Sequence, residues 1–168
     1  GATEYTDKVG DGAGVFKSND RGNSWTQINN GLDSLETNIL TVDPNDSETL
    51  YLGTDDDGVY KSTDGGESWK KLNVSSIPKS FGVGDIIVDP QNSNNIYIGT
   101  VDYFRLSESR GVLGDFGVYK STDGGATWEE FNAGLNHLGV FSLELSEENR
   151  ILYAGTRAGG VYWISLDN

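Results

Sequence analysis

The sequence predicts an all-β protein built from the four-stranded antiparallel blades of a β-propeller. A ten-residue phrase, YKSTDGGESW at 60–69, returns as YKSTDGGATW at 119–128 and, more loosely, as FKSNDRGNSW at 16–25. Short β-rich runs surround each copy, and clusters of Asp, Asn, Gly and Ser, which favour turns, separate them. A group of four short strands that repeats about every 40–50 residues is typical of propeller blades.

The composition fits many short strands joined by tight turns, and it limits the partners of the chain. The 168 residues include 23 Gly, 3 Pro and no Cys. Without Cys there is no disulfide bond, no catalytic thiolate and no Cys-ligated metal. The formal net charge of −14 repels nucleic acids and anionic membranes, and the sequence has no long unbroken apolar run. We therefore expect neither nucleic-acid binding nor membrane insertion.

The strands follow one another in the same order in each repeat. Around the second copy of the phrase the β-rich runs are NILTVDP, TLYLGT, GVYKS and SWKKLN. Around the third copy they are GDIIVDP, NIYIGT, GVYKS and TWEEFN. Runs such as LYL and IYI are apolar on both faces, as expected for a sheet stacked between two neighbours. These patterns predict two complete blades, at 39–73 and 85–132.

The two ends of the sequence predict incomplete blades. Within residues 1–30, GVFKS and SWTQIN supply only the last two strands of a blade. Within 140–168, VFSLELS, ILYAGT and GVYWIS supply only the first three. An incomplete blade presents an unpaired strand edge and an apolar face, which favour association. We expect flanking propeller blades or a second copy of the chain to complete the end blades.

The repeated phrase resembles a known motif, the Asp-box or BNR repeat. The pattern Ser-x-Asp-x-Gly-x-Ser/Thr-Trp is present three times, beginning at Ser18, Ser62 and Ser121. The flanking VDP, LYxGT and GVYKS segments also resemble those of Asp-box propellers, so the likeness covers nearly the whole chain. The family includes sialidases, xyloglucan-cleaving endoglucanases and sortilin-type receptors, and the resemblance implies an Asp-box β-propeller fold.

The three boxes are interpreted as structural. Each is expected in the hairpin between the third and fourth strands, where Asp and Ser side chains bond backbone N–H groups of the turn. Gly permits a positive φ, and Trp can bury a large ring against the sheet. The proposed structural residues are Ser18, Asp20, Gly22, Trp25, Ser62, Asp64, Gly66, Trp69, Ser121, Asp123, Gly125 and Trp128.

The loops at the opposite end of the blades differ between repeats, so that end is the predicted ligand face. The loop between the second and third strands is short in the second and fourth repeats but spans residues 101–116 in the third. Aromatic rings and cationic donors are typical of sugar or protein contact surfaces. The alternative for the long loop is packing on a neighbouring blade. The candidate ligand-binding residues are Tyr103, Phe104, Arg105, Arg110, His137 and Arg157.

Acidic residues supply one catalytic and one metal candidate. Asp85 begins the first strand of the third repeat, and the resemblance to family enzymes implies a position near the propeller axis, where a catalytic group would lie. Asp55, Asp56 and Asp57 offer oxygen ligands for a hard cation such as Ca²⁺, although their spacing is not that of an EF-hand. No cofactor is expected.

The sequence favours a non-catalytic function. A sialidase needs a triad of Arg residues to bind the substrate carboxylate. It also carries an FRIP-type motif; the segment Phe104–Arg105–Leu106 resembles the start of that motif but lacks its Pro. A xyloglucanase-like enzyme needs two carboxylates about 6.5–9.5 Å apart, and such family enzymes use two complete propellers. We therefore predict a secreted or cell-surface module that binds a glycan or protein or serves assembly. The alternative is part of a xyloglucanase-like or sialidase-like glycoside hydrolase.

Overall fold

The computed structural model describes residues 12–77, 81–102 and 115–167, in which all regular secondary structure is β strand. The strands form four antiparallel sheets, which we call blades 1 to 4 in chain order. Within the described ranges, no helix is long and apolar enough to span a membrane. Blade 1 contains β1 (Phe16–Lys17) and β2 (Thr26–Gln27); blade 2 contains β3 (Thr37–Asp43), β4 (Asp46–Thr54), β5 (Val59–Ser62) and β6 (Lys70–Lys71); blade 3 contains β7 (Gly82–Val88), β8 (Ile96–Val101), β9 (Val118–Ser121) and β10 (Glu129–Glu130); and blade 4 contains β11 (Val140–Ser146), β12 (Ile151–Thr156) and β13 (Gly160–Ser165).

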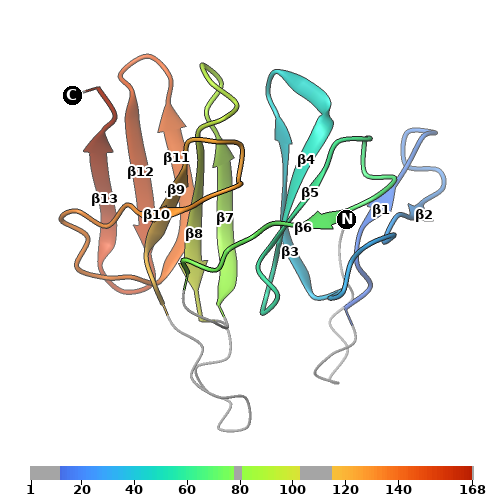
Figure 1. Cartoon of the computed structure of the whole chain (residues 1–168), viewed down its shortest axis with the longest axis horizontal. Coiled ribbons are helices and arrows are strands. Elements are labelled where there is room, and N and C mark those ends of the chain that lie inside the picture. The colour runs from blue at the N-terminus through green and yellow to red at the C-terminus, as the bar shows by residue number, and fades with distance from the viewer. Residues whose placement is uncertain (1–11, 78–80, 103–114, 168) are drawn as a thin grey trace, which may run out of the picture.

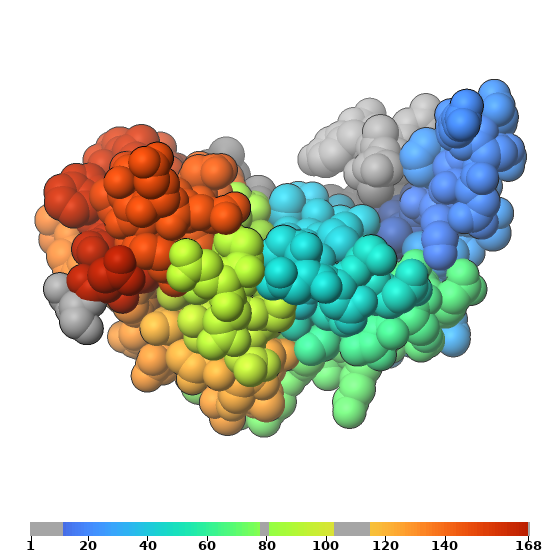
Figure 2. All heavy atoms as spheres, turned by 90° about the horizontal axis from the view of Figure 1, so that it is seen from above, coloured from blue at the N-terminus to red at the C-terminus, as the bar shows by residue number. Residues whose placement is uncertain are grey.

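The strands of each blade pair in chain order. Blades 2 and 3 have the orders β3-β4-β5-β6 and β7-β8-β9-β10, and blade 4 has the order β11-β12-β13. The sheets stand side by side (Figure 1), and from above they follow one another along a curve (Figure 2). The predicted all-β architecture, with two four-stranded blades between two incomplete ones, is confirmed.

The hydrophobic core lies between neighbouring blades. Tyr51 and Val59 of blade 2 are buried in one cluster with Val83, Ile86 and Val88 of blade 3. A second cluster joins blade 3 to blade 4 in the same way. Because blade 3 is covered on both faces, all six residues of β8 are buried, which explains why this strand reads as a continuous apolar run.

The Asp-box of blade 2 is held by side-chain bonds to its own turn. The Ser62 hydroxyl donates to the Asp64 carboxylate (2.7 Å), which also accepts the backbone N–H of Ser68 (2.9 Å). The Ser62 oxygen in turn accepts the N–H of Gly66 (2.9 Å). Gly66 has a φ of 91°, and a Cβ there would lie 2.7 Å from Ile28 of blade 1. Only Gly fits this position, because the turn needs both the positive φ and the close approach.

The box Trp connects each blade to the one before it. Trp69 and Trp128 are each 5% exposed, whereas Trp25 is 56% exposed. The Trp69 indole N–H donates to the backbone oxygen of Ile28 in blade 1 (2.8 Å). The Trp128 indole N–H is buried without a hydrogen-bond partner among the described residues. The box Trp is thus buried at two of the three boxes. Trp25 is exposed because the described residues contain no sheet that precedes blade 1.

Polar contacts also connect the blades at the hairpins that follow their first strands. The Ser93 hydroxyl of blade 3 donates to Asp43 of blade 2 (2.7 Å). Arg150 of blade 4 makes two hydrogen bonds to Asp89 of blade 3, at 2.9 and 2.6 Å. Burial by itself would raise the pKa of Asp89, but the bonds from Arg150 and from neighbouring backbone hold it below its ordinary value.

Truncation of a buried box Trp should destabilise the protein far more than truncation of the exposed one. We expect Trp69→Ala to lower the free energy of unfolding by about 3–5 kcal/mol, because it leaves a cavity between two blades. Trp25→Ala is the matched control and should cost less than about 1 kcal/mol, since its ring is largely solvated. Urea unfolding followed by circular dichroism measures both; equal losses would contradict the structural interpretation of the boxes.

The boxes should also make the protein sensitive to acid. Hydrogen bonds from Ser68 and Ser62 lower the pKa of Asp64 to about 2, and bonds from Thr127 and Ser121 do the same for Asp123. A carboxyl group with a lowered pKa stabilises the fold above its unfolded pKa near 3.8, and this stabilisation is lost as the pH falls towards about 2. Melting temperatures between pH 5 and pH 2 should therefore fall less steeply in the double variant Asp64→Asn/Asp123→Asn.

Candidate functional site

The loops at the end of the blades opposite the boxes form the surface that we call the loop face. It comprises residues 33–36, 55–57, 101–102, 133–139 and 157–159 among those described. These loops lie towards the lower end of the sheets in Figure 1, and the hairpins after β3, β7 and β11 lie at the upper end. The end that carries the boxes is nearly the same in each blade, so differences between blades are concentrated on the loop face.

Asp55 is an acid with an unusual environment on this face. It follows β4, and its backbone N–H donates to the backbone oxygen of Glu36 (3.0 Å). Burial, together with the nearby charges of Glu36 and Asp56, raises the pKa of Asp55 to about 6. A half-buried carboxyl group with this pKa keeps a proton at mildly acidic pH, so it can serve as a general acid there.

The other two residues of the acidic run have different partners. Asp57 accepts a hydrogen bond from the Tyr60 hydroxyl and forms an ion pair with Lys71. Asp56 accepts a long hydrogen bond from the Ser34 hydroxyl (3.5 Å). Within the described part of the chain, no group of three or more acidic or His side chains could hold a metal ion. The structure therefore does not gather the predicted cation ligands into a metal site.

Asp85 links two blades through its carboxylate. One oxygen accepts the backbone N–H of Ile86 (2.8 Å), and the other accepts the N–H of Leu143 in β11 (2.8 Å). Both strands have an irregular register at this point, between Val83 and Asp85 and between Val140 and Ser142. Burial raises the pKa of Asp85. The geometry gives this candidate acid a clear structural contact with the next blade.

A cationic and aromatic pair lies where blades 3 and 4 meet on the loop face. The Arg157 guanidinium lies over the Phe141 ring, 5.2 Å from its centroid, and donates to the backbone oxygen of Asp102. Phe141 is 40% exposed. His137 is exposed on the same face, and its ring centroid is 6.4 Å from that of Tyr162.

The predicted ligand residues divide into two sets. His137 and Arg157 lie on the loop face as expected, whereas Tyr103, Phe104, Arg105 and Arg110 lie outside the described residues. Two features of the site were not predicted from sequence: the effect of Glu36 on Asp55, and the ring of Phe141. Phe141 occupies the strand position held by Asn38 in β3 and Gly84 in β7, so its departure from the repeat is the signal that could have identified it.

The fold and the boxes define a β-propeller repeat protein of the Asp-box type. The family model Sortilin-Vps10, described as sortilin, neurotensin receptor 3, matches residues 13–162. The chain belongs to this family.

Similar proteins include xyloglucan-cleaving enzymes. Xyloglucanase Xgh74A of Acetivibrio thermocellus is 36% identical over 96 residues, a match that covers 52% of this chain and 11% of that enzyme. An ancestral GH74 enzyme is 26% identical over 90% of this chain and 20% of its own, with a TM-score of 0.71. The Niastella koreensis GH74 enzyme is 25% identical over 90% of this chain and 24% of its own, with a TM-score of 0.65.

The GH74 xyloglucanase from Xanthomonas campestris shares the fold at 17% identity, with a TM-score of 0.65 over 93% of this chain and 27% of its own. The chain spans about a tenth of the length of the curated relative and about a fifth to a quarter of the three solved enzymes.

Removal of the Asp55 charge should stabilise the fold at neutral pH. A carboxyl group with a raised pKa stabilises the folded state only while it is protonated, so stability falls as the pH rises from about 4 through about 6. We expect Asp55→Asn to have a higher melting temperature than the wild type at pH 7.5 and a flatter profile between pH 4 and 7. Glu147→Gln, a change at an exposed acid in the hairpin that follows β11, is the control; identical profiles for Asp55→Asn and the wild type would contradict the assignment.

Proposed function

We propose that the loop face binds a neutral polysaccharide of the xyloglucan type, as part of an Asp-box propeller protein. The observation that carries this proposal is the exposed Phe141 ring with the Arg157 guanidinium above it. A sugar ring has apolar C–H faces that stack on an aromatic side chain, and its hydroxyl groups accept bonds from a cationic donor. The exposed His137 adds a polar group to the same junction of blades.

The charge of the protein and its relatives support this choice of ligand. The net charge of −14 disfavours polyanionic glycans but does not repel an uncharged chain. The curated relative is a xyloglucanase, and the three solved neighbours are GH74 enzymes. A polysaccharide of this size does not cross a membrane, so we place the proposed binding outside the cell or at its surface.

A second candidate function is participation in glycoside hydrolysis, and the observation that favours it is the raised pKa of Asp55. Glycosidases use one carboxyl group with a raised pKa as the general acid. Inverting enzymes also need a second carboxylate about 6.5–9.5 Å away, as general base. In this alternative Asp55 donates the proton to the leaving oxygen, and the partner carboxylate comes from another part of the propeller protein.

Truncation of the exposed ring should weaken polysaccharide binding without unfolding the protein. We expect Phe141→Ala to weaken the binding of xyloglucan by about tenfold or more, because the stacking surface is lost. Val42→Ser is the control, since Val42 is a 48% exposed apolar residue at the end of β3 opposite the loop face. Affinity electrophoresis in gels with xyloglucan, with melting temperatures measured in parallel, gives both readings.

Reducing ends released from xyloglucan, measured with the propeller protein that contains this chain, separate the two candidate functions. If that protein binds xyloglucan and releases no reducing ends from it, the binding role is supported. Release of reducing ends that Asp55→Asn abolishes, with binding unchanged, would support hydrolysis instead. Mobility that is the same with and without xyloglucan would contradict both.

A further inference from the structure

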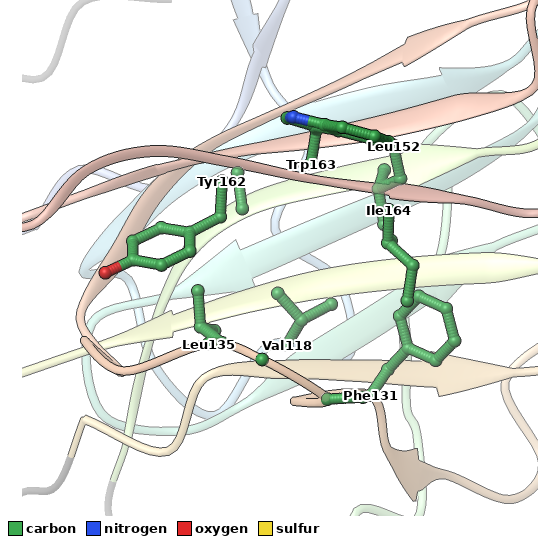
Figure 3. A pocket seen from close by; sticks show the side chains of 10 residues that line it. Val118, Phe131, Leu135, Leu152, Tyr162, Trp163 and Ile164 are labelled. Atoms are coloured by element: carbon green, nitrogen blue, oxygen red, sulfur yellow. The ribbon is translucent and has the colours of Figure 1, made fainter.

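A pocket with a volume of about 100 Å³ lies between blades 3 and 4, beside the outer edge of β13. Phe131 and Leu135 form its wall on the side of blade 3, and Leu152 and Ile164 form its wall on blade 4. In Figure 3 the side chains of Leu152 and Ile164 extend towards the Phe131 ring. The lining of the pocket is mostly apolar.

The repeats identify what such a pocket holds. Trp69 of blade 2 is buried in a cluster with six apolar or aromatic side chains of blades 1 and 2. These six are Val15, Ile28, Leu32, Leu50, Leu52 and Tyr60. The strand registers and the repeated sequence make them equivalent to six residues that line the open pocket. The six lining residues are, in the same order, Val118, Phe131, Leu135, Leu152, Ala154 and Tyr162.

The equivalent site is therefore occupied by a Trp ring at two junctions between blades and is open at the third. Trp69 fills it between blades 1 and 2, and Trp128 fills it between blades 2 and 3. Beside these rings, Tyr60 and Tyr119 are 0% and 1% exposed, whereas their equivalent Tyr162 is partly exposed. The pocket is therefore lined by the equivalents of the residues that surround a box Trp, and its Tyr is less covered than the Tyr beside Trp69 or Trp128.

The outer edge of β13, beside the pocket, corresponds to the strand edge that pairs with the Trp-bearing strand in blades 2 and 3. In blade 2, β6 pairs with the outer edge of β5 through Tyr60 with Lys71 and Lys61 with Lys70. In blade 3, β10 pairs with β9 in the same register. The equivalent residues of β13 are Tyr162 and Trp163, and β13 ends the strand order of its sheet. None of the described residues pairs with this outer edge of β13, and an edge of this kind accepts an added strand.

We infer that the pocket and the edge of β13 together form a docking site for an unpaired strand of Asp-box sequence, which inserts its Trp ring. The contacts of Trp69 define the expected geometry: its backbone N–H donates to the backbone oxygen of Asn30, and its indole N–H donates to the backbone oxygen of Ile28, each at 2.8 Å. The equivalent acceptors at the open site are the backbone oxygens of Ala133 and Phe131. The incoming strand completes blade 4 by strand addition.

The occupant is not a second folded copy of this chain. Trp69 and Trp128 are already buried in their own blades. Trp25 is exposed, but the β2 strand that follows it pairs with β1. Two copies also repel each other, because each carries a net charge of −14. A box strand that is not yet part of a sheet meets none of these obstacles, and a strand without net negative charge should bind better than an acidic one.

A capped synthetic peptide with the sequence of residues 62–73, STDGGESWKKLN, tests this inference on the intact chain. It carries two acidic and two basic residues, and the peptide of residues 121–132, STDGGATWEEFN, carries three acidic and none. We expect the first peptide to raise the melting temperature and to slow hydrogen exchange at the Trp163 amide, and the second to bind more weakly at low salt. Replacement of Trp by Ala in the first peptide should weaken binding at least tenfold.

Changes in the protein give a matched pair. Ala154→Phe fills the pocket and should weaken peptide binding at least tenfold, whereas Val161→Ser on the other face of β13 should leave it unchanged. Should Ala154→Phe fail to fold, the comparison of Trp and Ala peptides on the unaltered chain decides the question. Equal binding of those two peptides, or a dimer of the chain that Trp25→Ala disrupts, would overturn the inference.

Discussion

The insertion of a box Trp against the last strand of the preceding blade is the contact on which the arrangement of blades depends. The central strands of blades 2 and 3, β4 and β8, are largely buried between neighbouring blades, and their apolar side chains are unstable in contact with water. The ring of Trp69 buries part of this surface and bonds the backbone of Ile28 in the blade before it. The Asp-box turn places the ring, because Asp64 and Ser62 hold a backbone shape that only Gly66 completes.

This division of tasks leaves the opposite end of the blades free to vary. Asp64 and Asp55 illustrate the contrast, because the same residue type has opposite properties at the two ends. Hydrogen bonds from the turn lower the pKa of Asp64, whereas burial beside Glu36 raises the pKa of Asp55. The first carboxylate stabilises the turn, and the second keeps a proton available at mildly acidic pH. The two ends of blade 2 therefore hold their carboxyl groups in opposite electrostatic environments.

The junction between blades 3 and 4 combines both themes. At the loop face, Arg157 lies over the exposed Phe141 ring, whereas blade 2 has Asn38 at the position equivalent to Phe141. On the outer side of the same junction, the pocket beside Phe131 is lined by the equivalents of the residues that surround Trp69. A relationship to GH74 enzymes is consistent with this design, since the solved neighbours share the fold over most of this chain while this chain covers only part of theirs.

The sequence by itself determined the strands, their order and the three boxes, because alternating apolar patterns and turn hydrogen bonds act between residues that are close in the chain. It also placed His137 and Arg157 on the loop face. The tertiary structure decided what depends on residues distant in sequence: the exposure of Trp25, the bond from Leu143 to Asp85, and the effect of Glu36 on Asp55. Burial and charge at these positions are set by neighbouring blades and loops, and no local pattern records which neighbour will be there.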